Sequence, residues 1–337
     1  MKRVISVALV CLMALSASLA FAGGQSESAA KKKPLIGISK IVSHPALDAV
    51  EKGIQDELKA EGVDADYDLQ NANGDVNTAA SIATKFKSEN VTVAVGIATP
   101  TAQALVNAIK DIPIVYSAVT DPVSAGLVTS FDQGGPNVTG VSDLTPVKQQ
   151  IQLLTQIKPI KRLGHVYSSG EANAVTLAHL AEQACKDLGI EFVPATVTNS
   201  ADVKQATQSI IGRVDGIYVS TDNTVVSALP ALLDVAMQAK VPVMSADPSS
   251  AEKLDVLAAW GFDYYKMGRA TGRMIHDILG GKKTSDIPTK FMTDPSDVDL
   301  LVNLDVAQKL GLTVPQKIID TANKVVQNGQ LTNKSAQ

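Results

Sequence analysis

The sequence has few of the residues that metal-binding and redox chemistry use most. Of 337 residues, four are histidines and two are cysteines. The histidines have no spacing typical of metal ligands, so we expect no metal site. Only Cys185 lies in the body of the chain, which leaves it without a disulfide partner there. Stability must therefore come from apolar cores, with Cys185 as one small buried residue.

The chain also lacks the loops and nucleophile motifs of common enzymes. No G-x-G-x-x-G follows the first apolar run, and neither a phosphate-binding P-loop nor a G-x-S-x-G motif occurs. A net charge of −4 argues against nucleic acid as a partner. Aromatic residues are 4% of the chain, fewer than sugar-stacking sites usually need. These absences favour a binding protein without cofactor or catalytic residues over an enzyme.

The N-terminus has the pattern of a cleaved secretory signal. Lys2 and Arg3 precede an apolar stretch that ends at Ala20-Phe21-Ala22, which predicts a signal peptide over residues 1–22 and export to the periplasm. Cys11 raises the alternative of a lipoprotein, but bulky residues precede it and its apolar region is short. The Gly-, Ser-, Ala- and Lys-rich residues 23–33 predict a flexible leader.

The body of the chain alternates short apolar runs with helical patterns. The runs "PLIGISKIV", "VTVAVGIAT" and "IPIVYSAVT" are apolar on both faces, as strands of a covered parallel sheet are. Helical spacing follows the first run up to Gly62, and another helix is expected from about residue 75 to 88. Residues 93–122 and 216–250 share an order of elements, which predicts two α/β lobes built on one plan.

Polar side chains follow many of the predicted strands. Ligands of open parallel sheets bind beyond the carboxyl ends of the strands, so these residues are the candidate ligand-binding set. They are Ser39, His44, Thr99, Ser117, Thr120, Ser168, Glu171, Asn173, Asp222, Asn223 and Asp247. Helix N-termini with hydroxyl caps suit a carboxylate, and a carboxylate side chain suits an ammonium. The set therefore predicts a small zwitterion such as an amino acid, with Asp222 as the first choice of ammonium partner.

Several of these residues have a purely structural alternative. Asp247 and Thr99 precede proline and would each cap a helix without any ligand. His44, in "KIVSHPALDAVEKG", could be catalytic, a ligand contact or a helix cap. Pro45 marks the first helical position, so we expect His44 to be a cap first and a cleft contact second. If the protein were an enzyme, His44 and Asp222 would be the only acid–base pair that we could propose.

Several long motifs run from about residue 34 onward, among them "NANGDVNTAASIATKF", "IPIVYSAVTDPVSAGLV", "STDNTVVSAL" and "GFDYYKMGRATG". Through these motifs the chain resembles the tryptophan/tyrosine-type substrate-binding proteins of ABC transporters. It implies the type I periplasmic binding protein fold, with two Rossmann-like lobes of parallel sheet joined by a three-crossover hinge. It also implies a monomer that delivers an amino acid, with aromatic ones favoured, to an ABC permease and its ATPase.

The resemblance also divides the chain. Residues 34–142 and about 262–284 would form lobe 1, and residues 143–261 and about 285–330 would form lobe 2. The crossings are expected near residues 141–145, 258–263 and 281–288. An exported α/β enzyme acting on a small polar metabolite in the same cleft is the alternative function. A transcription regulator of the same fold is excluded, because a signal peptide stands where a DNA-binding module would be.

Overall fold

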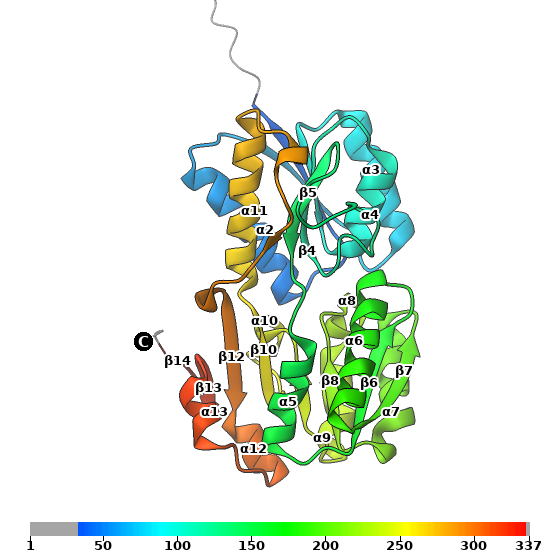
Figure 1. The fold of residues 1–337 in the computed structure, drawn as a ribbon, viewed down its shortest axis with the longest axis vertical. Helices are drawn as coiled ribbons and strands as arrows, with labels where there is room; N and C mark the ends of the chain where they lie inside the picture. Colours follow the sequence, from blue (N-terminus) through cyan, green and yellow to red (C-terminus); the bar gives the residue numbers. More distant parts are fainter. Residues whose placement is uncertain (1–32, 335–337) are drawn as a thin grey trace, which may run out of the picture. The chain divides into compact units, whose positions relative to one another are not determined.

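The expected apolar runs form a six-stranded parallel sheet in the first lobe. The computed structural model describes residues 33–334, and residues 34–334 belong to one compact unit. The strand order is β11-β5-β4-β3-β1-β2, and every neighbouring pair is parallel (Figure 1). The strands are β1 (Leu35–Lys40), β2 (Asp66–Asn71), β3 (Val93–Ile97), β4 (Ile114–Val119), β5 (Val138–Ser142) and β11 (Lys290–Phe291).

Helices cover the first sheet, and local capping sets their ends. They are α2 (Pro45–Ala60), α3 (Val76–Glu89), α4 (Thr99–Ala108) and α11 (Tyr264–Leu279). The side chain of Asp75 accepts a hydrogen bond from the Thr78 amide and starts α3. Asn90 adopts the left-handed conformation, with φ of 54°, and ends it. These two signals confirm the helix expected at about residues 75–88.

Helix α11 returns to the first lobe and packs closely on α2. A Cβ atom on Gly53 would overlap the carbonyl oxygen of Tyr265, and one on Gly268 would overlap that of Val50. Glu57, which is buried on α2, pairs with Arg269 and Arg273 of α11. Glycine at the crossing therefore lets the two backbones touch, and the ion pairs hold the helices in register.

The second lobe has an eight-stranded mixed sheet in the order β14-β13-β12-β10-β9-β8-β6-β7. The pairs β10/β12 and β13/β14 are antiparallel, whereas the other pairs are parallel. The strands are β6 (Arg162–Ser168), β7 (Glu191–Val197), β8 (Gly216–Val219), β9 (Val243–Ser245), β10 (Ala258–Phe262), β12 (Val298–Asn303), β13 (Lys324–Gln327) and β14 (Gln330–Asn333).

Helices of the second lobe enclose apolar clusters against this sheet. The α-helices are α5 (Val147–Ile157), α6 (Ala172–Leu188), α7 (Val203–Ile210), α8 (Asn223–Ser227), α9 (Leu229–Gln238), α10 (Pro248–Ala251), α12 (Leu304–Leu310) and α13 (Gln316–Thr321). Short 3-10 turns are η1 (Ser200–Asp202), η2 (Ile211–Arg213), η3 (Thr284–Asp286) and η4 (Pro295–Asp297). Cys185 is buried in one of these clusters without a disulfide.

The chain passes between the two sheets three times. The first two crossings run from β5 to α5 and from β10 to α11. The third lies later than residues 281–288, because β11 still pairs with β5 of the first sheet. Residues 285–291 thus belong with the first lobe, and the chain enters the second between β11 and β12. A two-residue strand has too short a pattern to be recognised in the sequence.

Within residues 33–334 no helix is both long enough and apolar enough to cross a membrane. The predicted signal peptide and nearly all of the leader lie outside the described residues.

Candidate functional site

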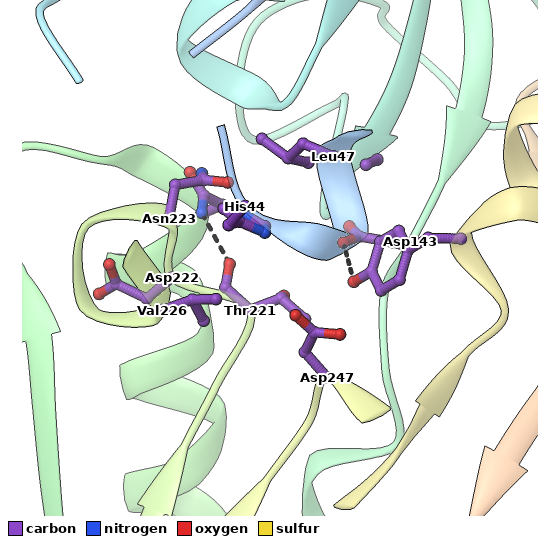
Figure 2. Close-up of a pocket in the computed structure, with 11 residues that line it drawn as sticks. His44, Leu47, Asp143, Thr221, Asp222, Asn223, Val226 and Asp247 are labelled. Atoms are coloured by element: carbon purple, nitrogen blue, oxygen red, sulfur yellow. Dashed lines mark hydrogen bonds between the residues drawn. The ribbon is translucent and has the colours of Figure 1, made fainter. Parts of the chain in front are cut away.

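The carboxyl ends of strands from both sheets meet at a small cavity between the lobes. Its volume is about 10 Å³, close to the space that one water molecule needs. Its walls come from the starts of α2, α6, α8, α10 and α11 and from two strand ends (Figure 2). The lining residues are His44, Leu47, Ala118, Asp143, Asn173, Thr221, Asp222, Asn223, Val226, Asp247 and Tyr264.

The loop before α2 holds His44 in this cavity. Ser43 Oγ donates to both carboxylate oxygens of Asp48, and Lys40 Nζ donates to Asp48 Oδ1 over 2.7 Å. His44 occupies the N-cap position, with Pro45 as the first helical residue, but its side chain makes no capping hydrogen bond. The expectation that His44 is chiefly a helix cap is therefore corrected, since its imidazole faces the cavity instead (Figure 2).

The imidazole of His44 is buried, and burial favours its uncharged form. Burial lowers its pKa, and the Asp247 carboxylate opposes this shift only in part. Nδ1 and Nε2 both lack a hydrogen-bond partner within residues 33–334. A buried imidazole without partners leaves one donor and one acceptor available for a bound molecule.

Asp247 presents a carboxylate oxygen to the same cavity. It caps α10, where its Oδ1 accepts from the Ser250 amide over 3.2 Å. Its Oδ2 is buried without a partner in the described part of the chain. Because a buried polar atom without a hydrogen bond costs about 1–3 kcal/mol, this oxygen is suited to an outside donor.

Asp143 contributes a second acidic group at the first crossing. Its Oδ1 accepts from Thr120 Oγ1 over 3.1 Å, and its Oδ2 accepts from the Tyr264 hydroxyl over 3.0 Å. Burial raises the pKa of Asp143 to about 6, although both hydrogen bonds act in the opposite direction. Asp143 thus joins the wall of the cavity to the hinge.

Asp222 organises the second-lobe side of the cavity. Its Oδ1 accepts from the Val225 amide over 3.0 Å, and its Oδ2 accepts from the Ser168 amide over 2.6 Å. Burial, followed by the nearby Glu171, raises its pKa to about 8. Both oxygens are already used by the backbone. The role of Asp222 as ammonium partner stays a prediction, and Asp247, whose Oδ2 has no partner within residues 33–334, is a second candidate at the same cavity.

Glu171 is occupied in a similar way behind the cavity. It accepts from Asn223 Nδ2, from the Thr224 amide and from the Thr224 hydroxyl at 2.5–2.9 Å. Asn173 donates to the Thr221 carbonyl over 3.1 Å, while its Oδ1 has no partner among the described residues. These bonds fix the starts of α6 and α8 around the cavity.

Five of the eleven candidate residues line the cavity, namely His44, Asn173, Asp222, Asn223 and Asp247. The other six lie around it or deeper: Ser39, Thr99, Ser117, Thr120, Ser168 and Glu171. Ser117 Oγ hydrogen-bonds to Thr271 Oγ1 over 2.7 Å, and Thr120 supports Asp143. Ser39 Oγ and Thr99 Oγ1 are buried without partners within residues 33–334. Ligand contact by all eleven stays a prediction.

Six lining residues were absent from the candidate set, namely Leu47, Ala118, Asp143, Thr221, Val226 and Tyr264. Asp143 and Tyr264 lie at two of the crossings between the lobes, so the predicted hinge could have pointed to both residues. Ala118 has a positive φ of 54° where the β4/β5 register shifts, a conformation that its residue type does not suggest. Leu47 and Val226 show only helical core spacing.

The lining suits a small polar molecule that carries a positive charge. It holds no lysine or arginine, and its three aspartates include Asp247, whose Oδ2 has no partner within residues 33–334. No group of His, Cys, Asp and Glu able to hold a metal ion occurs within residues 33–334. The starts of α2 and α6, which both reach the cavity, favour a negative group at the other end of such a molecule.

Two α/β lobes joined by three crossings around an enclosed polar cavity define a hinged solute-binding protein. The comparisons agree with this class. Residues 35–326 match the family described as ABC transporter substrate binding protein, and the chain belongs to that family.

Several known proteins are similar to this one over most of its length. A tyrosine-binding protein of Clostridioides difficile (strain R20291) is 37% identical over 84% of this chain and 82% of its own length. A solved structure of a conserved domain protein from Vibrio cholerae is 44% identical, with a TM-score of 0.85 over 88% of this chain and all of the other. An ABC domain from Streptococcus pneumoniae in complex with L-Trp is 33% identical, with a TM-score of 0.83 over 87% of this chain and all of the other.

A further solved structure, the ligand-free, open structure of a substrate-binding protein from Clostridium difficile, is 38% identical over 84% of this chain and 96% of its own length, with a TM-score of 0.63.

Proposed function

We propose that this protein is the extracytoplasmic receptor of an ABC importer and binds one amino acid, with aromatic amino acids favoured, in the cavity between its lobes. It delivers that ligand to a membrane permease driven by an ATPase. The receptor releases its ligand unchanged, and it acts as a monomer in the periplasm after removal of residues 1–22.

The observation that carries this proposal is a set of buried polar atoms without partners. They belong to four lining residues and lack hydrogen bonds within residues 33–334: both ring nitrogens of His44, Oδ1 of Asn173, Oγ1 of Thr221 and Oδ2 of Asp247. Folded proteins pair nearly all of their buried polar atoms, so this concentration at one cavity favours a ligand that completes the hydrogen bonds.

The chemistry of these atoms supports an α-amino acid. The carboxylate oxygen of Asp247 and the amide oxygen of Asn173 can accept from an ammonium. His44 and the first backbone amides of α2, next to Leu47, can donate to a carboxylate. The names of two relatives, one a tyrosine-binding protein and one solved with L-Trp, support an aromatic side chain.

Isothermal titration of the purified protein with each of the twenty amino acids tests the proposal. The protein is first unfolded in denaturant, dialysed and refolded, so that any ligand carried through purification is removed. We expect heat with tyrosine, tryptophan or both at one ligand per chain. A chain that refolds but gives no heat with any amino acid would overturn the proposed ligand class and leave the family unchanged.

A second experiment tests export. The mass of the protein recovered from the periplasm should correspond to a chain that begins at residue 23. Retention of residues 1–22, or a lipid on Cys11, would contradict the predicted cleavage.

A further inference from the structure

A second concavity adjoins the cavity on the outer side of His44. It is a groove of about 400 Å³ between the lobes, which we call the outer groove. His44 and Val226 line both spaces, so these two side chains separate the inner cavity from the outer groove. The outer groove therefore offers space for an aromatic ring of a ligand next to the His44 imidazole.

Segments of both lobes pass from the inner cavity to the outer groove. The start of α2 lines the cavity with Leu47 and the groove with Pro45. The turn that begins α10 lines the cavity with Asp247 and the groove with Ser250. Since these segments bound both spaces, any separation of the lobes would join the two into one.

The two spaces differ in chemistry. The inner cavity carries the three aspartates and two asparagines. The groove has apolar surface from Pro45, Val226, Pro230 and Leu254, together with four serines, Glu252 and Lys253. An amino acid with a ring has the same division, with charges at one end and apolar surface at the other. The inner cavity, at about 10 Å³, has no room for a ring in the present arrangement.

The groove also holds an unused polar atom. Ser250 is 7% exposed, and its Oγ is buried without a hydrogen bond to any described residue. Ser227, on the opposite wall, differs because its Oγ donates to the Thr224 carbonyl over 2.8 Å. Ser250 Oγ is therefore an unpaired atom covered by the groove wall, which a ligand reaches only when that wall moves, whereas Ser227 Oγ is satisfied within its own helix.

We propose that the outer groove is the side-chain subsite of the ligand. On separation of the lobes the inner cavity widens from about 10 Å³ to take the charged end of the amino acid. The ring then lies in the groove against Val226 and Leu254, and Ser250 Oγ hydrogen-bonds to the polar atom of the ring. The His44 imidazole, which lines both spaces, lies between the charged end and the ring. This assignment rests on the proposed function and adds to it a basis for preferring tyrosine or tryptophan to phenylalanine.

Titration of Ser250→Ala with tyrosine, tryptophan and phenylalanine tests the polar contact, with Ser227→Ala as the matched control. We expect affinity for tyrosine or tryptophan to fall roughly five- to tenfold in Ser250→Ala, because one hydrogen bond is lost. Affinity for phenylalanine should not change, and Ser227→Ala should match the wild type. Equal losses for all three amino acids, or none, would overturn the role of Ser250.

Filling the groove tests the position of the ring. Leu254→Trp should weaken aromatic amino acids roughly five- to a hundredfold, because the added ring fills the space of the ligand's ring. Leu254 also packs on the core of the second lobe, so the melting temperature without ligand is measured alongside and the comparison is made on protein that stays folded. Slower association and dissociation with an unchanged Kd would show that the groove is only a passage and would overturn the assignment. If the wild type binds aromatic amino acids and neither variant differs from it, the subsite is wrong and the proposed function stands.

Discussion

The hydroxyl of Tyr264 donates a 3.0 Å hydrogen bond to Oδ2 of Asp143. Asp143 lies on the first crossing between the lobes, and Tyr264 begins α11 just after the second. Both residues also line the cavity. This bond therefore links the first and second crossings of the hinge beside the cavity. A movement of Asp143 on ligand binding would shift both crossings.

Removal of this hydroxyl should destabilise the protein. Tyr264→Phe leaves one oxygen of a buried carboxylate without its donor, which costs about 1–3 kcal/mol. The neighbouring Tyr265 is a matched control, because its hydroxyl bonds Asp56 near the surface. Urea unfolding should show a clear loss for Tyr264→Phe and a loss below about 1 kcal/mol for Tyr265→Phe. Equal losses would contradict the special position of the first bond.

Stability without ligand should depend on pH through Asp143. Burial raises its pKa to about 6, above the ordinary value of 3.8, so the folded protein binds this proton more tightly than the unfolded chain. The contribution is therefore fully present below about pH 4 and is lost as pH rises through 6, with a total of about 3 kcal/mol. The difference in unfolding free energy between wild type and Asp143→Asn should fall over this range. A difference that does not vary with pH would contradict the shifted pKa.

Two buried aspartates should respond differently to the same substitution. Asp247→Asn keeps an oxygen for the Ser250 amide but removes the charge facing the cavity, so ligand affinity should fall roughly ten- to a hundredfold with little change in stability. Asp222→Asn has one acceptor for two backbone amides, so it should lose about 1–3 kcal/mol of stability. Titration and urea unfolding of both variants check this, and a reversed pattern would assign the ammonium to Asp222.

Local signals made most of the fold predictable from the sequence. The β1 run is apolar on both faces because helices cover both, and Asp75 caps α3 at the position that the pattern indicated. The β11 strand was missed because it is two residues long and exists only through its pairing with β5. The antiparallel β10/β12 pair likewise depends on where the third crossing falls.

The site was predictable in location and only partly in detail. The rule that ligands bind at strand ends found His44 and Asp247, because each directly follows a strand or its loop. It could not tell that both oxygens of Asp222 are used by backbone amides, since Ser168 lies 54 residues away in the chain. Nor could it show that the His44 side chain leaves its cap position to face the other lobe.

The contact between α2 and α11 predicts a sharp difference between glycines. Gly268→Val should destabilise the first lobe by more than about 3 kcal/mol or prevent folding, because a Cβ there overlaps the backbone of α2. Gly212→Ala is the control, since no atom lies within 4 Å of its added Cβ. Thermal unfolding of both variants checks this, and tolerance of Gly268→Val would show that the helices can move apart at little cost.

The central claim is that the cavity recognises the ammonium of an amino acid through Asp247, and one calorimetric comparison tests it most directly. The refolded wild type is titrated with L-tryptophan and L-tyrosine and with the analogues of each that keep the ring and carboxylate but lack the amino group. We predict one-to-one binding of at least one of the two amino acids and a loss of roughly a hundredfold or more for its deaminated analogue. Equal affinity for an amino acid and its deaminated analogue would contradict the account.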